Sequence, residues 1–351
     1  MNFFGLERLD QIDMVVTDHV RVKRWLRSGP AFPASDFDYI KLKLDLDPSK
    51  IHVIGHHEAH AASAFYPSGF QEAAILIVDG QGTDGETTSF FAGQGSQIEC
   101  LDRYRFHGIG ACYAYVTREI LALGTGSEGK TMGLAPYGAD YESTLHISGH
   151  LDGVKTDYSD FARRQPLSDI MNHVENPERL YPFKKPYSRA STKEEVLEPY
   201  FAAAAFDIQK ETERAMTHLG IEIKKRTGAR NLCIAGGVGL NSVANKIVLD
   251  TAGFEDIFIF PACSDSGVPF GLALWGYNVL KDMGEFSRKQ FHFPDTYAGI
   301  AYPESYVQEV LQRHHIRYRS LDLKEVAEKL ADGKIIGWFS GRSEYGPRAL
   351  G

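Results

Sequence analysis

The sequence has few cysteines, no long apolar run and no excess of positive charge. Its four cysteines are scattered without a Cys-x-x-Cys pair, so we expect reduced, mostly buried thiols in a cytoplasmic protein. No apolar stretch is long enough to span a bilayer, and the first residues lack the pattern of a signal peptide. The net charge of -8 argues against a broad basic surface for nucleic acid. There is no repeat of solenoid period and no low-complexity tract.

The 351 residues, 43% hydrophobic and 24% charged, have the profile of a soluble globular protein with one large α/β unit or two domains. Short apolar runs alternate with helical stretches, which predicts the α/β class. The predicted strands are 12–17, 51–54, 73–78, 88–92, 231–234, 257–260 and 335–339. The predicted helices are 59–64, 111–122, 199–225, 241–250, 268–281, 303–314 and 323–332.

Two features of the chain interrupt this alternation. The segment of about 141–191 is rich in Pro, Tyr, Asp, Arg and His, and we interpret it as an insertion or a connection that crosses between lobes, a kind of long loop that often carries substrate contacts. Both ends also look cut, because the first residues resemble the tail of a helix and the last ones stop inside a charged, Gly-rich motif. We therefore expect a fragment of a longer protein.

Three histidines lie where a strand-like run gives way to an Ala-rich helical run. On a helix, His56 and His60 are four residues apart and share one face, so both imidazoles can hold one metal ion. Glu58 is turned away from that face, so the pattern is not that of a zinc peptidase. A lone histidine here would be a core-edge or solvated residue, but the pair favours a metal.

A carboxylate far downstream is the best third ligand. Asp265 lies on the turn between a predicted strand and the next helix, where its ordinary role would be that of an N-cap. Two histidines and one carboxylate with open positions suit iron, manganese or zinc.

Two Gly-rich turns are candidate sites for a nucleotide. Asp79 ends a buried strand and is followed by Gly80 and Gly82, whose flexible backbone can turn N–H groups toward an anion, although an ordinary hairpin has the same pattern. Gly236 and Gly237 follow a second strand and permit close approach of a base or ribose. A helix then opens near Asn241 with its positive end toward that turn. The alternative is a simple tight turn.

A third Gly-rich segment contains Gly129, Lys130 and Thr131 and matches the letters of a P-loop. We reject that interpretation because a helix precedes the segment, where a P-loop follows a strand, and Pro136 follows within two turns. Lys130 stays a candidate contact for a phosphate or carbamoyl group.

Together these motifs resemble the NodU/CmcH/TobZ O-carbamoyltransferases. The similar stretches, in the same order along nearly the whole chain, are 56–66 (HHEAHAASAFY), 78–82 (VDGQG), 129–138 (GKTMGLAPYG), 235–241 (AGGVGLN) and 344–351 (EYGPRALG). The resemblance implies a two-lobed actin-like ATPase fold of the sugar kinase and heat-shock chaperone type, shared with the tRNA threonylcarbamoyl transferases.

The resemblance also implies a division of the chain. Residues 1–195 would form the first lobe, without its opening hairpin and with the insertion of about 141–191. Residues 196–340 would form the second lobe, and residues 341–351 would begin the linker to an absent YrdC-like domain. In the family that domain makes carbamoyl adenylate from carbamoyl phosphate and ATP, and the actin-like domain passes the carbamoyl group to a hydroxyl of a small-molecule or saccharide acceptor.

Site residues follow from the same resemblance. The implied metal ligands are His56, His60 and Asp265, which with Lys130 form the candidate catalytic set. The implied nucleotide contacts are Asp79, Gly80 and Gly82 of the phosphate-side hairpin, and Gly236, Gly237 and Asn241 of the second turn.

Several alternatives stay open at this point. The general base has no assignment, and His57 is a candidate for it that is more often a structural neighbour. A tRNA threonylcarbamoyl transferase would share the His pair and the distal Asp but lacks the MGLAPYG and GPRALG strings. The third reading is a nucleotide-binding module without catalysis. The acceptor and a homodimer also stay open.

Overall fold

The computed structural model describes residues 11–18, 47–83, 85–105, 108–145, 188–192, 194–284, 293 and 295–347. The chain divides into two compact units, Met1–His292 and Phe293–Gly351, each taken by itself below. Most of the predicted insertion of about 141–191 lies outside the described residues.

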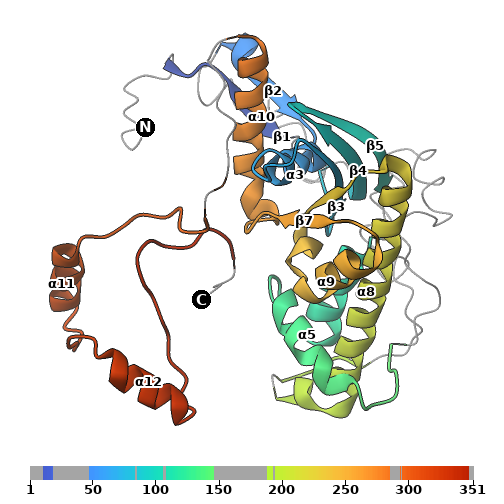
Figure 1. The fold of residues 1–351 in the computed structure, drawn as a ribbon. Coiled ribbons are helices and arrows are strands. Elements are labelled where there is room, and N and C mark those ends of the chain that lie inside the picture. The colour runs from blue at the N-terminus through green and yellow to red at the C-terminus, as the bar shows by residue number, and fades with distance from the viewer. Residues whose placement is uncertain are drawn as a thin grey trace, which may run out of the picture. The chain divides into compact units, whose positions relative to one another are not determined.

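The first unit is built on a five-stranded sheet with the order β5-β4-β3-β6-β7 (Figure 1). Its strands are β3 (Glu72–Val78), β4 (Glu86–Gln94), β5 (Gln97–Arg105), β6 (Asn231–Ala235) and β7 (Asp256–Ile259). The pairs β3–β4 and β4–β5 are antiparallel, whereas β3–β6 and β6–β7 are parallel. A separate parallel pair joins β1 (Val15–Asp18) to β2 (Ile51–Ile54).

Alternate residues of β3 belong to two different cores. Ala74, Leu76 and Val78 pack in the larger cluster on one face of the sheet. Ile75 and Ile77 pack in a second cluster on the other face. This is the period of two that a strand imposes, and burial on both faces explains why β3 is a continuous apolar run.

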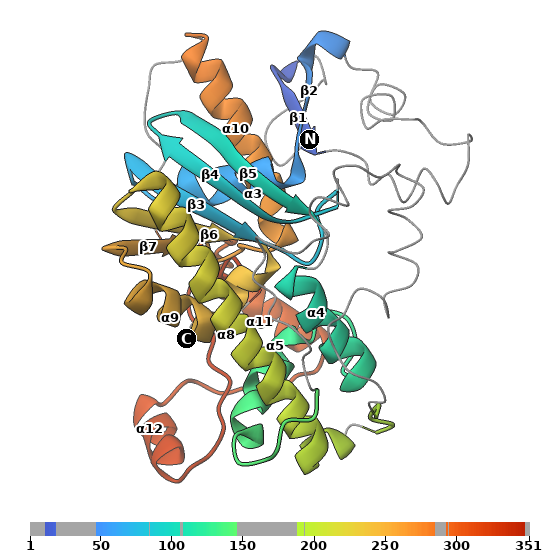
Figure 2. The same ribbon diagram turned by 90° about the vertical axis from the view of Figure 1, so that its right-hand side faces the viewer.

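Helices cover both faces of this sheet (Figures 1 and 2). On one face lies α3 (His56–Phe65), with α10 (Val268–Asp282) packed on it. The helices of the other face are α4 (Ile109–Tyr115), which continues as a π-helix (Val116–Ile120), α5 (Glu128–Leu134), α8 (Pro199–Thr227) and α9 (Ser242–Thr251). The α/β class predicted from the sequence is confirmed.

The second unit contains α11 (Glu304–Arg313) and α12 (Leu323–Ala331), neither of which buries a side chain. Helix α12 begins after Asp322, whose carboxylate accepts hydrogen bonds from the backbone of Lys324 and Glu325. None of the described helices is both long and apolar enough to cross a membrane.

Two strand predictions differ from the structure. The predicted strand 335–339 is wrong, because that apolar run has no partner strand among the described residues and the side chain of Ile335 is fully exposed. Strand β5 was not predicted, because it is an edge strand whose side chains are mostly exposed and polar. The Gly95-Ser96 turn between β4 and β5 is the hairpin signal that indicates it.

Strands from both sides of the predicted lobe boundary at residues 195 and 196 pair in one sheet. β3 lies before that boundary and β6 after it, and Leu76 is in register with Ile234. The two predicted lobes therefore share the central sheet of the first unit.

The contact between α10 and α3 depends on a glycine. A Cβ at Gly271 would overlap the carbonyl oxygen of Ala59, and it would lie 3.0 Å from the backbone nitrogen of Ser63. We predict that Gly271→Ala forces the helices apart and lowers the free energy of unfolding by about 1–3 kcal/mol, measured by urea denaturation.

The matched control is Gly133→Ala on α5, where a new Cβ meets nothing within 4 Å. That substitution removes a glycine from a helix and should stabilise the protein by about 0.5–1 kcal/mol. Equal stabilities of the two variants would contradict the close contact of α10 with α3.

Candidate metal centre

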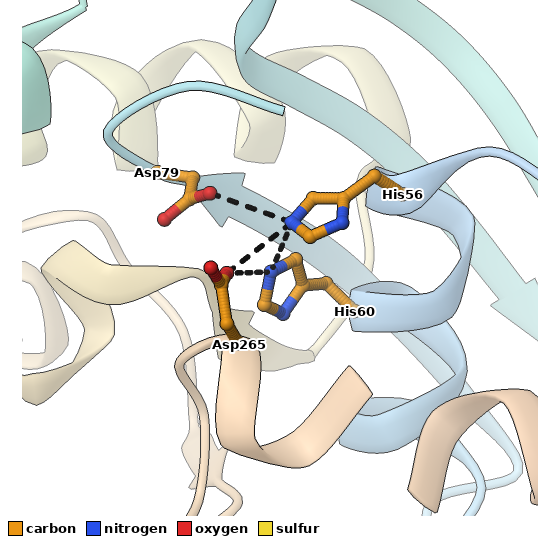
Figure 3. Close-up of side chains that lie close together, drawn as sticks. All are labelled: His56, His60, Asp79 and Asp265. Atoms are coloured by element: carbon orange, nitrogen blue, oxygen red, sulfur yellow. Dashed lines mark hydrogen bonds and ion pairs between the residues drawn. The ribbon is translucent and has the colours of Figure 1, made fainter. Parts of the chain in front are cut away.

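Two buried imidazoles face each other on α3. The helix begins at His56 because Gly55 before it has extended backbone, and His60 lies one turn later. Their Nε2 atoms are 3.1 Å apart (Figure 3), and both side chains are buried. The structure therefore has the shared face that the four-residue spacing predicts.

Two carboxylates complete the cluster. Asp265 Oδ1 lies 3.3 Å from Nε2 of His56 and 3.5 Å from Nε2 of His60. Asp79, directly after β3, places Oδ2 3.6 Å from Nε2 of His56 (Figure 3). One donor atom from each of the four residues lies within 4.8 Å of all the others. The structure thus brings the three predicted ligands together and adds Asp79 to them.

The spacing of these donors fits a metal ion. Four ligands about 2.1 Å from one ion in a tetrahedron would lie roughly 3.4 Å from one another. Four of the six separations between the donor atoms run from 3.1 to 3.6 Å, and every pair lies within 4.8 Å. Two ring nitrogens facing each other with two carboxylates also form the mixed set that zinc, iron and manganese accept.

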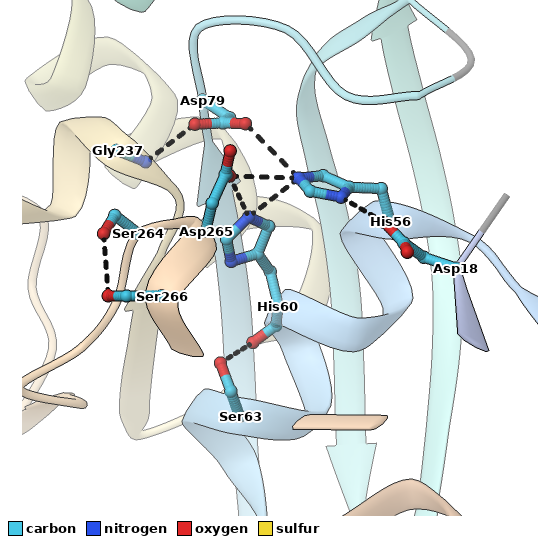
Figure 4. A network of polar contacts seen from close by, with 9 residues as sticks. All are labelled: Asp18, His56, His60, Ser63, Asp79, Gly237, Ser264, Asp265 and Ser266. Carbon is cyan, nitrogen blue, oxygen red and sulfur yellow. Dashed lines mark hydrogen bonds and ion pairs between the residues drawn. The ribbon is translucent and has the colours of Figure 1, made fainter. Parts of the chain in front are cut away.

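The other ring nitrogen of His56 is held by a residue that the sequence analysis did not identify. Nδ1 of His56 lies 2.8 Å from Oδ2 of Asp18, at the end of β1 (Figure 4). No motif marks Asp18. The contact depends on β1 pairing with β2, where Asp18 is in register with Ile54.

The carboxylates dominate the electrostatics of the site. Burial opposes a positive charge on His56, but hydrogen bonds with Asp18, Asp265 and Asp79 outweigh it and raise the pKa of His56 to about 11. Hydrogen bonds with His56 and His60 hold the pKa of Asp265 far below its usual value. The cluster is therefore strongly attractive to a cation.

Asp79 stays ionised although it is buried. Burial raises the pKa of Asp79, but the hydrogen bond with His56 and the charge of His60 lower it by more. The pKa of Asp79 therefore lies well below its ordinary value. Its second oxygen, Oδ1, accepts a hydrogen bond of 2.8 Å from the backbone N–H of Gly237 (Figure 4). One carboxylate thus joins the metal-ligand cluster to the second Gly-rich turn.

That turn needs its first glycine. Gly236 has a φ of +90°, and a Cβ there would overlap the carbonyl oxygen of Val78. Its backbone N–H donates to the carbonyl of Cys263, 2.8 Å away, close to Asp265 in the chain. The turn therefore contacts both segments that present carboxylates to the cluster.

The remaining nucleotide candidates lie on either side of this centre. Gly80 and Gly82 form the turn from β3 to β4, where N–H of Asp79 bonds to the carbonyl of Thr87, so the hairpin reading is confirmed. Asn241 is the N-cap of α9, and its side-chain amide pairs with that of Gln209 on α8. Their nucleotide contacts stay predictions.

Lys130 lies apart from this centre. It is exposed on α5, which packs against α8 on the opposite face of the sheet from α3 (Figures 1 and 2). Gly129 and Lys130 lie inside the helix and not in a loop before it, which agrees with the rejection of a P-loop. A role for Lys130 stays a prediction.

Two of the three residues between the paired histidines, His57 and Glu58, point elsewhere. His57 is fully buried, its Nδ1 is 2.7 Å from the hydroxyl of Ser89, and burial lowers its pKa well below the usual value. This environment favours the structural reading of His57 over that of a general base. Glu58 forms an ion pair with Arg103 of β5, away from the cluster.

Asp265 is not the N-cap of α10. That helix begins at Val268 after Gly267, and Asp265 opens the short 3-10 helix Asp265–Gly267 before it. The 3-10 helix turns the carboxylate toward α3, where it contacts both imidazoles.

Two protein-family models match this chain. Residues 31–274 match the model of the carbamoyltransferase N-terminus, and residues 327–351 match that of the carbamoyltransferase C-terminus. The chain belongs to the carbamoyltransferase family. The resemblance based on the sequence motifs is confirmed.

Two relatives and one solved structure are similar to this chain. The chain is 34% identical over 303 residues to an uncharacterized protein of Synechocystis, covering 84% of this chain and 49% of that protein. It is 32% identical over 317 residues to the nodulation protein NolNO of Sinorhizobium fredii, covering 88% and 43%. The chain thus spans about half the length of these relatives. The crystal structure of HypF from T. kodakarensis is similar over 77% of this chain and 41% of that one, with 14% identity and a TM-score of 0.41.

We predict that the protein binds one equivalent of iron, manganese or zinc and that Asp265→Asn and His60→Ala each weaken this binding. The loss should exceed the roughly 10–100-fold effect of removing an outer-layer partner, because a direct ligand is lost. Elemental analysis and chelator competition measure it. The control is His52→Ala, which changes a histidine of β2 whose ring is tilted against that of Trp275. Equal metal content in Asp265→Asn and the unmodified protein would contradict the site.

We also predict that metal affinity rises about tenfold per pH unit between pH 6 and 8.5. A proton on His56 must leave before the ion binds, and the raised pKa of about 11 keeps that proton in place throughout this range. An ordinary histidine would instead give a plateau above about pH 7. Chelator competition at several pH values distinguishes the two, and such a plateau would contradict the carboxylate effect.

Proposed function

We propose that the protein transfers a carbamoyl group from carbamoyl adenylate to a hydroxyl of a small-molecule or saccharide acceptor, and that this chain carries the transfer site. The supporting observation is the meeting of two histidines and two aspartates beside the Gly236–Gly237 turn, in a member of the carbamoyltransferase family. We infer the two-lobed actin-like ATPase fold for it from the same resemblance.

The proposed reaction exchanges one carbon–oxygen bond for another. The acceptor oxygen bonds to the carbamoyl carbon, the bond from that carbon to the adenylate phosphate breaks, and AMP leaves with the electron pair. The acceptor proton passes to a base that has no assignment. The adenylate would be made from carbamoyl phosphate and ATP by the YrdC-like domain that the resemblance implies, so the proposed reaction sequence needs that domain as well as this chain.

Four side chains of this chain would hold the metal, namely His56, His60, Asp79 and Asp265. A bound ion supplies Lewis-acid chemistry, which polarises the carbamoyl carbonyl or anchors the AMP phosphate. The imidazoles are buried, whereas 59% of the Asp265 side chain is exposed. We therefore place the substrates on the Asp265 side, while the packed α3 side excludes water.

The nucleotide would lie along the two Gly-rich turns. The N–H of Gly237 donates a hydrogen bond to Asp79, so one role of this turn is to hold that carboxylate in place. Asn241 opens α9, whose N-terminal end favours an anion. Gly80 and Gly82 provide backbone amides on the other side, as in phosphate-binding turns.

Two alternatives are weaker. A tRNA threonylcarbamoyl transferase shares the histidine pair, but the matches to both the N-terminal and C-terminal carbamoyltransferase models favour an O-carbamoyltransferase. A non-catalytic nucleotide-binding module would not need a buried four-residue ligand set. Because ATP and carbamoyl phosphate are cytoplasmic metabolites, we place the reaction in the cytoplasm.

The test is an assay of the full-length protein with ATP, carbamoyl phosphate and a panel of alcohols. We expect acceptor-dependent release of AMP together with a carbamoylated alcohol. Asp265→Asn should reduce product formation at least about 100-fold, because weaker metal binding removes the Lewis acid, an effect about as large as losing one electrostatic stabiliser of the transition state.

The control is Glu255→Gln, which removes an exposed carboxylate that pairs with Arg230. It should leave the rate unchanged. Nucleotide binding without any carbamoylated product would support the binding module instead.

A further inference from the structure

Asp18 occupies a position that only the tertiary fold provides. It is the last residue of β1, and the parallel register places it beside Ile54, two residues before His56. Strand β1 thus delivers a carboxylate to the first turn of α3 from 38 residues earlier in the chain. Figure 4 shows Asp18 on the opposite side of the His56 ring from Asp79 and Asp265.

The ring of His56 is held at both nitrogens. Nδ1 is 2.8 Å from Asp18, whereas Nε2 faces His60 and Asp265. A carboxylate only accepts hydrogen bonds, so Asp18 requires the hydrogen on Nδ1. In neutral imidazole this leaves the lone pair on Nε2, directed at the other ligands.

The two histidines differ in this respect. Nδ1 of His60 is buried and has no hydrogen-bond partner among the described residues. The ring of His60 is fully enclosed, so packing alone can orient it. His56 is the first residue of the helix and is also buried, and Asp18 adds a hydrogen bond that constrains its ring.

We propose that Asp18 is a positioning residue of the metal centre, which holds the ring of His56 with its Nε2 lone pair toward the ion. This inference rests on the metal site of the proposed function. Asp18 is not one of the four residues whose donor atoms form the cluster. A carboxylate hydrogen-bonded to a ligating histidine typically contributes 10–100-fold to metal affinity.

The experiment compares Asp18→Ala and Asp18→Asn in the full chain. Affinity for Zn²⁺ alone is measured by chelator competition at one fixed pH. We expect a loss of about 10–100-fold for Asp18→Ala. Asp18→Asn should lose less, because its amide oxygen still accepts the hydrogen bond from Nδ1 without carrying charge.

The matched control is Asp13→Asn, an exposed aspartate just before β1. It should bind Zn²⁺ as tightly as the unmodified protein. Urea unfolding of the metal-free variants shows whether Asp18 only stabilises the fold. A loss of stability in Asp18→Ala with unchanged Zn²⁺ affinity would overturn the proposal.

A second readout is the visible spectrum of the Co²⁺-substituted protein. A reoriented imidazole alters the ligand field, so the bands of Asp18→Ala should shift, while those of Asp13→Asn should not. Identical spectra and affinities would reject the role of Asp18 whatever the enzyme does. The unmodified protein could also bind Zn²⁺ and yet transfer no carbamoyl group. A reduced Zn²⁺ affinity of Asp18→Ala would then support the positioning role of Asp18 and reject only the proposed reaction.

Discussion

The centre depends on compensation between buried histidines and carboxylates. Ionised Asp79 is buried, and such a group is costly unless it is paired and hydrogen-bonded. His56 contacts three carboxylates at once. The charge of this one ring therefore offsets much of the repulsion among them. Taking His56 away would remove the imidazole partner of buried Asp79 and leave it with the hydrogen bond from the backbone N–H of Gly237. A cation is the natural complement of such an arrangement.

The scaffold supplies these groups by one rule. Asp18 ends β1, His56 lies just beyond β2, Asp79 follows β3, and the Gly236–Gly237 turn follows β6. Open α/β sheets bind their ligands at the carboxyl ends of the strands. In the described part of this chain, the parallel pairs β1–β2 and β3–β6 both present site residues at those ends. The packing of α10 on α3 at Gly271 then holds the helix that presents both imidazoles.

Local sequence patterns predicted several strands of the sheet and the histidine pair of the site. The apolar period identified β3 and β6, and a four-residue spacing identified His56 and His60. Strand β5 escaped because an exposed edge strand lacks the apolar signal. The role of Asp18 was not predicted, because its contact with His56 arises from strand register and not from any nearby motif. The predicted strand 335–339 shows the converse, since an apolar run without a partner forms no ladder.

The hydrogen bond from Gly237 to Asp79 also limits how that carboxylate can coordinate. Oδ1 is occupied by the backbone amide, and Oδ2 alone faces the imidazoles. An ion among these residues would therefore meet Asp79 as a monodentate ligand. One donor atom from each of the four side chains lies in the cluster, so these residues would supply few ligands to a bound ion and would leave room for exchangeable groups.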